Sequence, residues 1–248
     1  MESSSAWSSG HRVGPFAVQR VLSDRTALAA DAGGRRVVLK PIDDDCMLES
    51  AIHPSVATRL ERIQQLPTTV LARLIGVWRD GLRAVMAWEY VTARSLDELF
   101  ADPRADAETL VASLRDTALA IEAMHGLGIV HGAIHERNIF VQTPGLLLTH
   151  ASPLLWDDPG VDEQAFLSLA ERAAGVRGTH LASVPAAVQA ARDSSTPLAT
   201  FRTLLARPAD TPPSDGRDPL PKRRSLLGAA ITTRVAIIVT WLIWRAVR

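Results

Sequence analysis

Three histidines stand near one another in the middle of the chain, and imidazole is a common side chain for metal binding and proton transfer near neutral pH. His131 and His135 are four residues apart, and His150 follows downstream. Three imidazoles could in principle hold a zinc ion. However, the glutamate of the HExxH pattern is missing, and the residues around His131 are typical of a loop. No metal site is therefore predicted, and His135 is expected to lie in solvent.

The loop that carries His131 follows an alanine- and leucine-rich helical pattern over 110–124, and an apolar run comes after it. This order of elements resembles the catalytic loop of eukaryotic-type Ser/Thr protein kinases. In that family the loop reads His-Arg-Asp-Leu-x-x-x-x-Asn, where the Asp accepts the substrate hydroxyl proton and the Asn holds magnesium. Here His131 and Asn138 match at the same spacing, but Gly132 replaces the Arg and Ala133 replaces the catalytic Asp.

The resemblance also implies a second metal-binding position. Kinases carry Asp-Phe-Gly after the strand that follows the loop, and the equivalent positions here read His150-Ala151-Ser152. Magnesium prefers oxygen ligands, so an imidazole is a poor replacement for the Asp. No catalytic residue is therefore assigned, since the expected Asp positions are Ala133 and His150. The segment between these positions and a helix expected over 162–170 is also too short for a substrate platform.

A nucleotide site implied by the resemblance is degenerate. The strand that ends in Lys40 is similar to the kinase strand whose Lys contacts nucleotide phosphates. The turn before it contains no Gly to close over phosphates, and it carries the repelling carboxylate of Asp24. The helix Glu that pairs with this Lys in kinases falls on Arg59. Lys40 and Asn138 remain the cofactor-binding candidates; no cofactor is assigned, and residual ATP binding is left open.

The order of predicted elements gives the fold class. Short strands joined by turns are predicted over 14–41 and 71–91, a helix lies between them, and helical patterns dominate the rest. With the resemblance, this implies an α+β, two-lobed protein kinase-like fold with a shortened C-lobe. The predicted boundaries are a disordered leader at 1–12 and a kinase-like domain at 13–207, with an N-lobe over about 13–91 and a C-lobe over about 92–207.

The C-terminal part differs in composition from the rest. A linker rich in proline and basic residues is predicted over 208–225, followed by the apolar stretch 226–244. A helix of this length spans about 28 Å, close to a bilayer core. Arg234 inside it costs about 2.5 to 3.5 kcal/mol, which the surrounding apolar residues offset. A transmembrane helix is favoured over a core or surface-lying helix.

Composition limits the partners and the compartment. The 27 basic and 27 acidic residues leave no net charge, so nucleic acid is not an expected partner. A single cysteine, Cys46, excludes an internal disulfide. Because the N-terminus lacks the pattern of a secretory signal, the N-terminal domain is expected in the cytoplasm of a single-pass, tail-anchored membrane protein. The alanine- and arginine-rich usage suggests a bacterial source.

Taken together, these features predict a membrane-anchored pseudokinase, a binding, scaffolding or regulatory module in signalling that does not transfer phosphate. Its expected partners are the membrane and a protein such as a kinase or a kinase substrate. The alternative is a divergent ATP-dependent Ser/Thr protein kinase with unorthodox catalytic residues.

Overall fold

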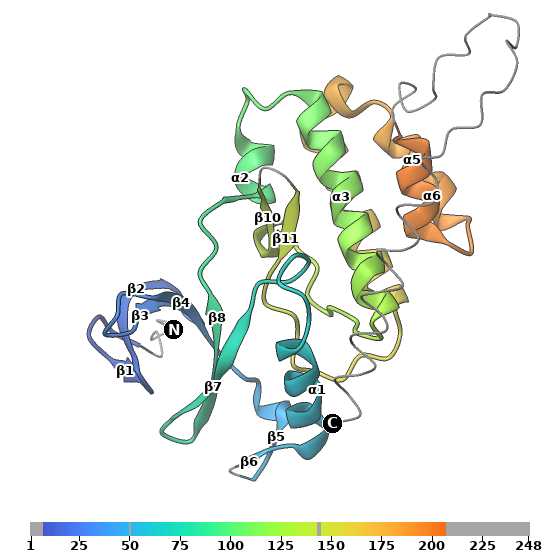
Figure 1. The fold of residues 1–248 in the computed structure, drawn as a ribbon. Coiled ribbons are helices and arrows are strands. Elements are labelled where there is room, and N and C mark those ends of the chain that lie inside the picture. Colours follow the sequence, from blue (N-terminus) through green and yellow to red (C-terminus); the bar gives the residue numbers. More distant parts are fainter. Residues whose placement is uncertain (1–6, 50, 143–144, 207–248) are drawn as a thin grey trace, which may run out of the picture. The chain divides into compact units, whose positions relative to one another are not determined.

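The computed structural model describes residues 7–49, 51–142 and 145–206, and over these it has an α+β fold. Strands make up most of the first part of the chain, and helices make up most of the second (Figure 1).

A six-stranded antiparallel sheet forms the first part, in the order β1-β2-β3-β4-β8-β7. The interior strands β4 and β8 are buried over most of their length, whereas the strand that begins at Phe16 is buried only at Phe16 and Val18. In the pairing of β4 with β8, Lys40 lies opposite Met86. The strands are β1 (Arg12–Val13), β2 (Phe16–Ser23), β3 (Thr26–Ala30), β4 (Arg36–Pro41), β7 (Leu74–Asp80) and β8 (Arg83–Glu89).

The chain before residue 13 is part of this sheet's core, which differs from the predicted leader. Trp7 is only 4% exposed and packs in the same apolar cluster as Val13 and Phe16. Its indole nitrogen donates a hydrogen bond of 2.7 Å to the carboxylate of Asp80. Burial of one large aromatic ring is worth a few kcal/mol, which is enough to hold a serine-rich segment on the sheet. Residues 7–12 are therefore folded, and β1 begins at Arg12.

Helix α1 (Pro54–Gln64) packs beside the sheet (Figure 1). It begins with Pro54 in the first turn, where proline costs no hydrogen bond, and the side chain of His53 accepts a bond from the amide of Ser55. The preceding turn η1 (Asp44–Cys46) and the short strands β5 (Met47–Leu48) and β6 (Ala51–Ile52) connect β4 to it. Cys46 is buried in the core.

The second part of the described chain is mainly helical, with one small sheet. Its longest helix, α3, is capped by the Asp106 carboxylate, and Ser95 and Glu98 form a reciprocal capping box at the start of α2. The main core runs without a break from Met86 and Trp88 of β8, past α1, to these helices. The helices are α2 (Leu96–Ala101), α3 (Ala107–Gly126), α4 (Gly160–Arg177), α5 (Val184–Arg192) and α6 (Pro197–Leu204), with the turns η2 (Glu136–Asn138) and η3 (Gly178–Leu181) and the strands β9 (Arg94–Ser95), β10 (Ile139–Val141) and β11 (Leu146–Leu148).

Among the residues that the structure describes, no helix is both long and apolar enough to cross a bilayer. The predicted linker at 208–225 and the predicted span at 226–244 lie outside the described residues.

Candidate functional site

A cavity of about 360 Å³ lies between the sheet and the loop that carries Asn138. Lys40 reaches it from β4, and Asn138 and His150 reach it from the segments around β10 and β11. Glu89 is its only acidic lining residue among those described. The lining consists of Leu22, Ser23, Thr26, Val38, Lys40, Glu89, Tyr90, Val91, Arg137, Asn138, Phe140, Thr149 and His150.

Both the nitrogen and the oxygen of the Asn138 side-chain amide form hydrogen bonds. Its Nδ2 donates a hydrogen bond of 2.8 Å to the carbonyl of Ala133, which directs Oδ1 toward Nδ1 of His150, 3.3 Å away. Since Oδ1 can only accept, we assign the ring proton of His150 to Nδ1. Thr149 Oγ1 lies 3.0 Å from the same nitrogen. The amide oxygen that would face magnesium in a kinase is therefore bonded to an imidazole.

His150 is neutral at physiological pH. Burial lowers its pKa to about 3, and the positive charge of Lys40, together with that of His131 when it is protonated, acts in the same direction. The residue lies at φ 60°, in the left-handed region. Its ring meets the fully buried indole of Trp88 edge to face, with centroids 5.8 Å apart. The position at which the resemblance implies a metal-binding carboxylate thus holds a neutral ring in an aromatic contact.

His131 supports the loop from inside the core. It is completely buried, and its Nε2 lies 3.1 Å from the carbonyl of Thr149 while Nδ1 accepts from the amide of Ala133 at 3.2 Å. Burial lowers the pKa of His131 to about 4, although the nearby carboxylate of Asp162 opposes the shift. The neutral ring ties the loop to the end of β11.

Asp162 in the first turn of α4 holds the same loop from the other side. Its carboxylate accepts hydrogen bonds from the backbone amides of His131 at 2.6 Å and Gly132 at 2.8 Å, and it lies 3.0 Å from Nε2 of His125. Burial alone would raise the pKa of Asp162, but these bonds outweigh it and lower the pKa. No sequence pattern indicated this role, because an Asp at a helix start is usually a local cap.

Arg59, on which the resemblance places the kinase helix Glu, bonds to backbone carbonyls. The buried guanidinium donates from Nε to the carbonyl of Ser152 at 3.0 Å and from Nη2 to the carbonyl of Val130 at 2.5 Å. Burial lowers the pKa of Lys40, opposed by the charge of Asp43. Within the described part of the chain, Lys40 forms no ion pair.

The indole of Trp156 lies directly on the loop. Gly132 has φ 68°, and a Cβ added there would stand 2.2 Å from the Trp156 ring. An arginine at this position would therefore collide with the indole. The segment from Ser152 to Pro159 crosses from the loop to α4 without a helix or a strand, and Trp156 covers the backbone beside Ala133.

Metal ligands do not gather elsewhere in the described residues: no group of three or more His, Cys, Asp or Glu side chains could hold an ion there. His135 is half exposed, and its Nδ1 lies 3.6 Å from the carboxylate of Glu136.

Solved structures with this arrangement are protein kinase domains. The kinase domain of PknI from Mycobacterium tuberculosis aligns with a TM-score of 0.58 at 16% identity, over 81% of this chain and 96% of that chain. The structure of Rad53 1–466 in complex with AMP-PNP aligns with a TM-score of 0.56 at 15% identity, over 77% of this chain and 66% of that chain. This chain has a protein kinase-like fold. No protein-family model and no curated protein matches its sequence.

The kinase-like fold brings together the residues that the sequence singled out. Lys40, Asn138 and His150 line one cavity between the N-lobe sheet and the C-lobe. Ala133 contributes only its backbone, which binds Asn138 and His131. Arg59, in contrast, links α1 to the C-lobe backbone. The arrangement can bind a small molecule, but it presents no carboxylate for a metal ion at the two expected positions.

Proposed function

We propose that this protein is a pseudokinase that acts as a binding or regulatory module in signalling and does not transfer phosphate. The observation that carries the proposal is the hydrogen bond between Asn138 and His150, because it engages the last oxygen ligand of the kinase pattern with an imidazole. The cavity keeps Lys40, whose amine no described carboxylate pairs with.

The size of the lost contribution supports an inactive site. Phosphoryl transfer depends mainly on positioning and on metal electrostatics, and a single electrostatic group typically contributes about 3 to 4 kcal/mol to such a transition state. The base position is Ala133, the metal position is a neutral His150, and the helix Glu is replaced by Arg59. The transition-state stabilisation lost at these three positions together exceeds what Lys40 alone could supply.

We propose further that the apolar stretch 226–244 anchors the protein in a membrane, with the N-terminal domain in the cytoplasm. The length and hydropathy of this stretch support the proposal. The partner would be a protein at the same membrane, such as a kinase or a kinase substrate. Removal of residues 222–248 should move the protein from the membrane fraction to the soluble fraction; a truncated protein that stays with the membrane would contradict the anchor.

A second candidate function is a divergent ATP-dependent Ser/Thr kinase. The presence of Lys40 in an open cavity of about 360 Å³ favours it, as does the nucleotide analogue named for the similar Rad53 structure. The two candidates separate in one assay. The purified full chain in detergent is incubated with ATP and magnesium, and phosphate on the chain itself and on casein is measured beside the Lys40→Ala variant. No transfer above that of the variant is expected, and transfer that Lys40→Ala abolishes would establish the kinase.

A further inference from the structure

A second cavity, of about 380 Å³, lies at the surface between the start of α1 and the segment before α4. We call it the Trp156 groove. It shares no lining residue with the interlobe cavity. The residues that line it are Asp45, His53, Val56, Leu154, Leu155 and Trp156.

The groove exposes two consecutive large apolar side chains. Leu155 is 52% exposed and Trp156 is 37% exposed. Contiguous exposed apolar groups next to a hollow mark interaction sites more often than scattered ones do, and tryptophan is among the residues that contribute most to protein interfaces. Neither side chain belongs to the interlobe cavity, so the proposed inactive site does not account for their exposure.

Leu155 and Trp156 form the apolar wall of the groove, and contacts with the core side of the chain hold this wall in place. The indole of Trp156 rests on the backbone of Gly132, and the amide of Leu154 donates to the hydroxyl of Ser152 at 3.2 Å. The carbonyl of Ser152 in turn accepts from the buried guanidinium of Arg59. A surface fixed before binding loses little conformational entropy when a partner arrives. The groove is therefore preorganised, as a docking surface requires.

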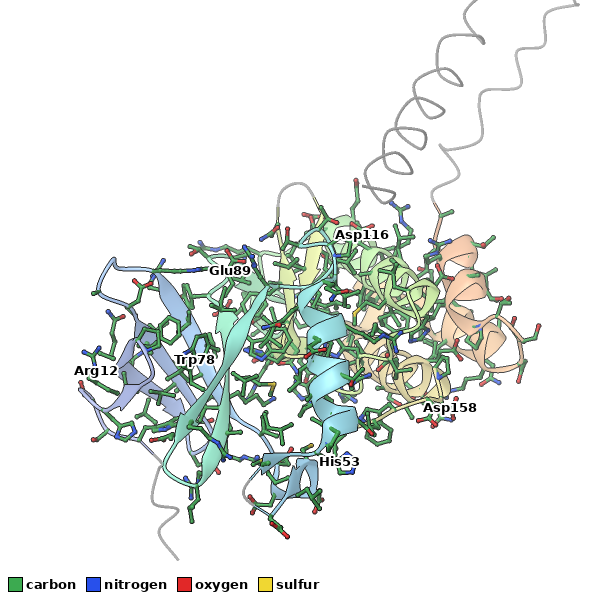
Figure 2. The ribbon with its side chains drawn as sticks, turned by 60° about the horizontal axis from the view of Figure 1, so that its bottom comes forward. Arg12, His53, Trp78, Glu89, Asp116 and Asp158 are labelled. Carbon is green, nitrogen blue, oxygen red and sulfur yellow. The ribbon has the colours of Figure 1, made fainter. Side chains whose placement is uncertain are left out.

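One carboxylate lines the groove, and three others adjoin its lining residues in sequence. Asp45 lines the groove from η1, with Asp44 beside it, and Asp157 and Asp158 follow directly after Trp156. Figure 2 shows His53 at the start of α1 and Asp158 on the segment that leads to α4. No Lys or Arg is among the residues that line the groove. A rim with this charge attracts cationic partners and repels acidic ones.

We propose that the Trp156 groove is the docking site for a basic, apolar segment of a partner protein. In this complex an aliphatic or aromatic side chain packs against Leu155 and Trp156, and Lys or Arg side chains beside it pair with Asp45 and Asp157. The proposal deepens the proposed function and rests on it, because it names the surface through which a non-catalytic module holds its partner.

The test uses a phage library of random dodecamer peptides selected on the purified full chain in detergent. Peptides with a net positive charge and at least one large apolar residue should be enriched. Leu155→Asp should weaken the binding of synthetic versions by about tenfold or more, because it places a charge in the apolar wall. The control Leu82→Asp should bind as the parent does, since Leu82 is 85% exposed in the turn between β7 and β8 and lies outside the groove.

A second variant tests the charges and does not disturb the apolar wall. Asp45→Asn combined with Asp157→Asn should weaken binding several-fold at low salt and make little difference at 1 M salt, where the screening length is about 3 Å. If Leu155→Asp lowers the melting temperature, this pair of substitutions at exposed or half-exposed carboxylates still decides the question.

Four results would overturn the proposal. The first is a lack of enrichment over detergent alone, or enrichment of acidic peptides, and the second is equal binding by the Leu155→Asp variant. The third is binding that appears only after Lys222, Arg223 and Arg224 are replaced by Ser, which would mean that the chain's own basic segment occupies the groove. The fourth is self-association that Leu155→Asp abolishes, which would identify a second copy as the occupant. None of these results measures phosphate transfer, so failure of the groove and failure of the proposed function are separate outcomes.

Discussion

The indole of Trp156 packs on the backbone of Gly132, so any side chain at position 132 must displace the ring. Replacing Gly132 by Ala puts a methyl group 2.2 Å from the indole and forces a residue with a Cβ to keep φ 68°. The left-handed conformation costs an alanine roughly 1 to 2 kcal/mol. Because the indole is 37% exposed, it can swing outward, but it then loses its packing on the loop.

The packing contribution follows from the buried area. If about 130 Å² of the indole is removed from water, burial is worth about 3 kcal/mol at about 25 cal/mol per Å². Gly132→Ala should then cost about 3 kcal/mol, because the backbone cost adds to the re-exposure of about half of this area. Trp156→Ala should cost a similar amount, about 3 kcal/mol. The double variant should cost about 4.5 kcal/mol, because the methyl group no longer has a ring to displace.

The measurement is a double-mutant cycle by urea unfolding of the full chain in detergent, followed by circular dichroism. The two single substitutions should sum to about 1.5 kcal/mol more than the double variant. Strict additivity within about 0.5 kcal/mol would refute the reasoning, since it would mean that the indole does not rest on Gly132. Gly34→Ala is the matched control, because Gly34 also has positive φ, at 82°, but a Cβ there meets nothing within 4 Å. It should show only the backbone cost.

Three further predictions concern the buried polar groups. Folding lowers the pKa of His150 from 6.5 to about 3, so the folded protein keeps this ring neutral and acidification below about pH 6.5 should destabilise it. Asn tolerates the same backbone conformation. His150→Asn should therefore reduce the slope of unfolding free energy against pH by about 1.4 kcal/mol per pH unit, measured by urea titrations between pH 6 and 4. Arg59→Ala leaves two buried carbonyls without hydrogen-bond donors and should lower the free energy of unfolding by about 3 to 5 kcal/mol. The control Arg62→Ala loses one exposed hydrogen bond and should cost less than about 1 kcal/mol. Equal losses of the two variants in thermal unfolding would contradict this. Asp162→Asn should lower the free energy of unfolding by about 2 to 4 kcal/mol at pH 7. Because folding lowers the pKa of Asp162, this loss should shrink as the pH falls below about 4. A loss that does not change with pH would rule out an ionised Asp162.

Local pattern was sufficient for most elements of the fold. The strand that ends in Lys40, a helix between the two groups of strands and the helix before the His131 loop were predicted from alternation and from helical spacing. These signals act between residues that are near in sequence, so they can be read without knowledge of the fold. The N-terminal limit was not predicted, because Trp7 is held by a strand that follows much later in the chain.

For the candidate site, the sequence likewise showed which residue types stand at each position, and the fold decided what they contact. The residue types at the kinase positions follow directly from the order of amino acids: Ala133 and His150 in place of carboxylates, and Arg59 in place of a Glu. The contacts of these side chains are set by the folded structure. No pattern in the sequence indicated that His150 bonds to Asn138, or that Arg59 reaches backbone carbonyls of the other lobe. The position of the Trp156 indole on Gly132 was equally unforeseen. These interactions join residues far apart in the chain, and their strength depends on burial, which exists only when both lobes have folded around them.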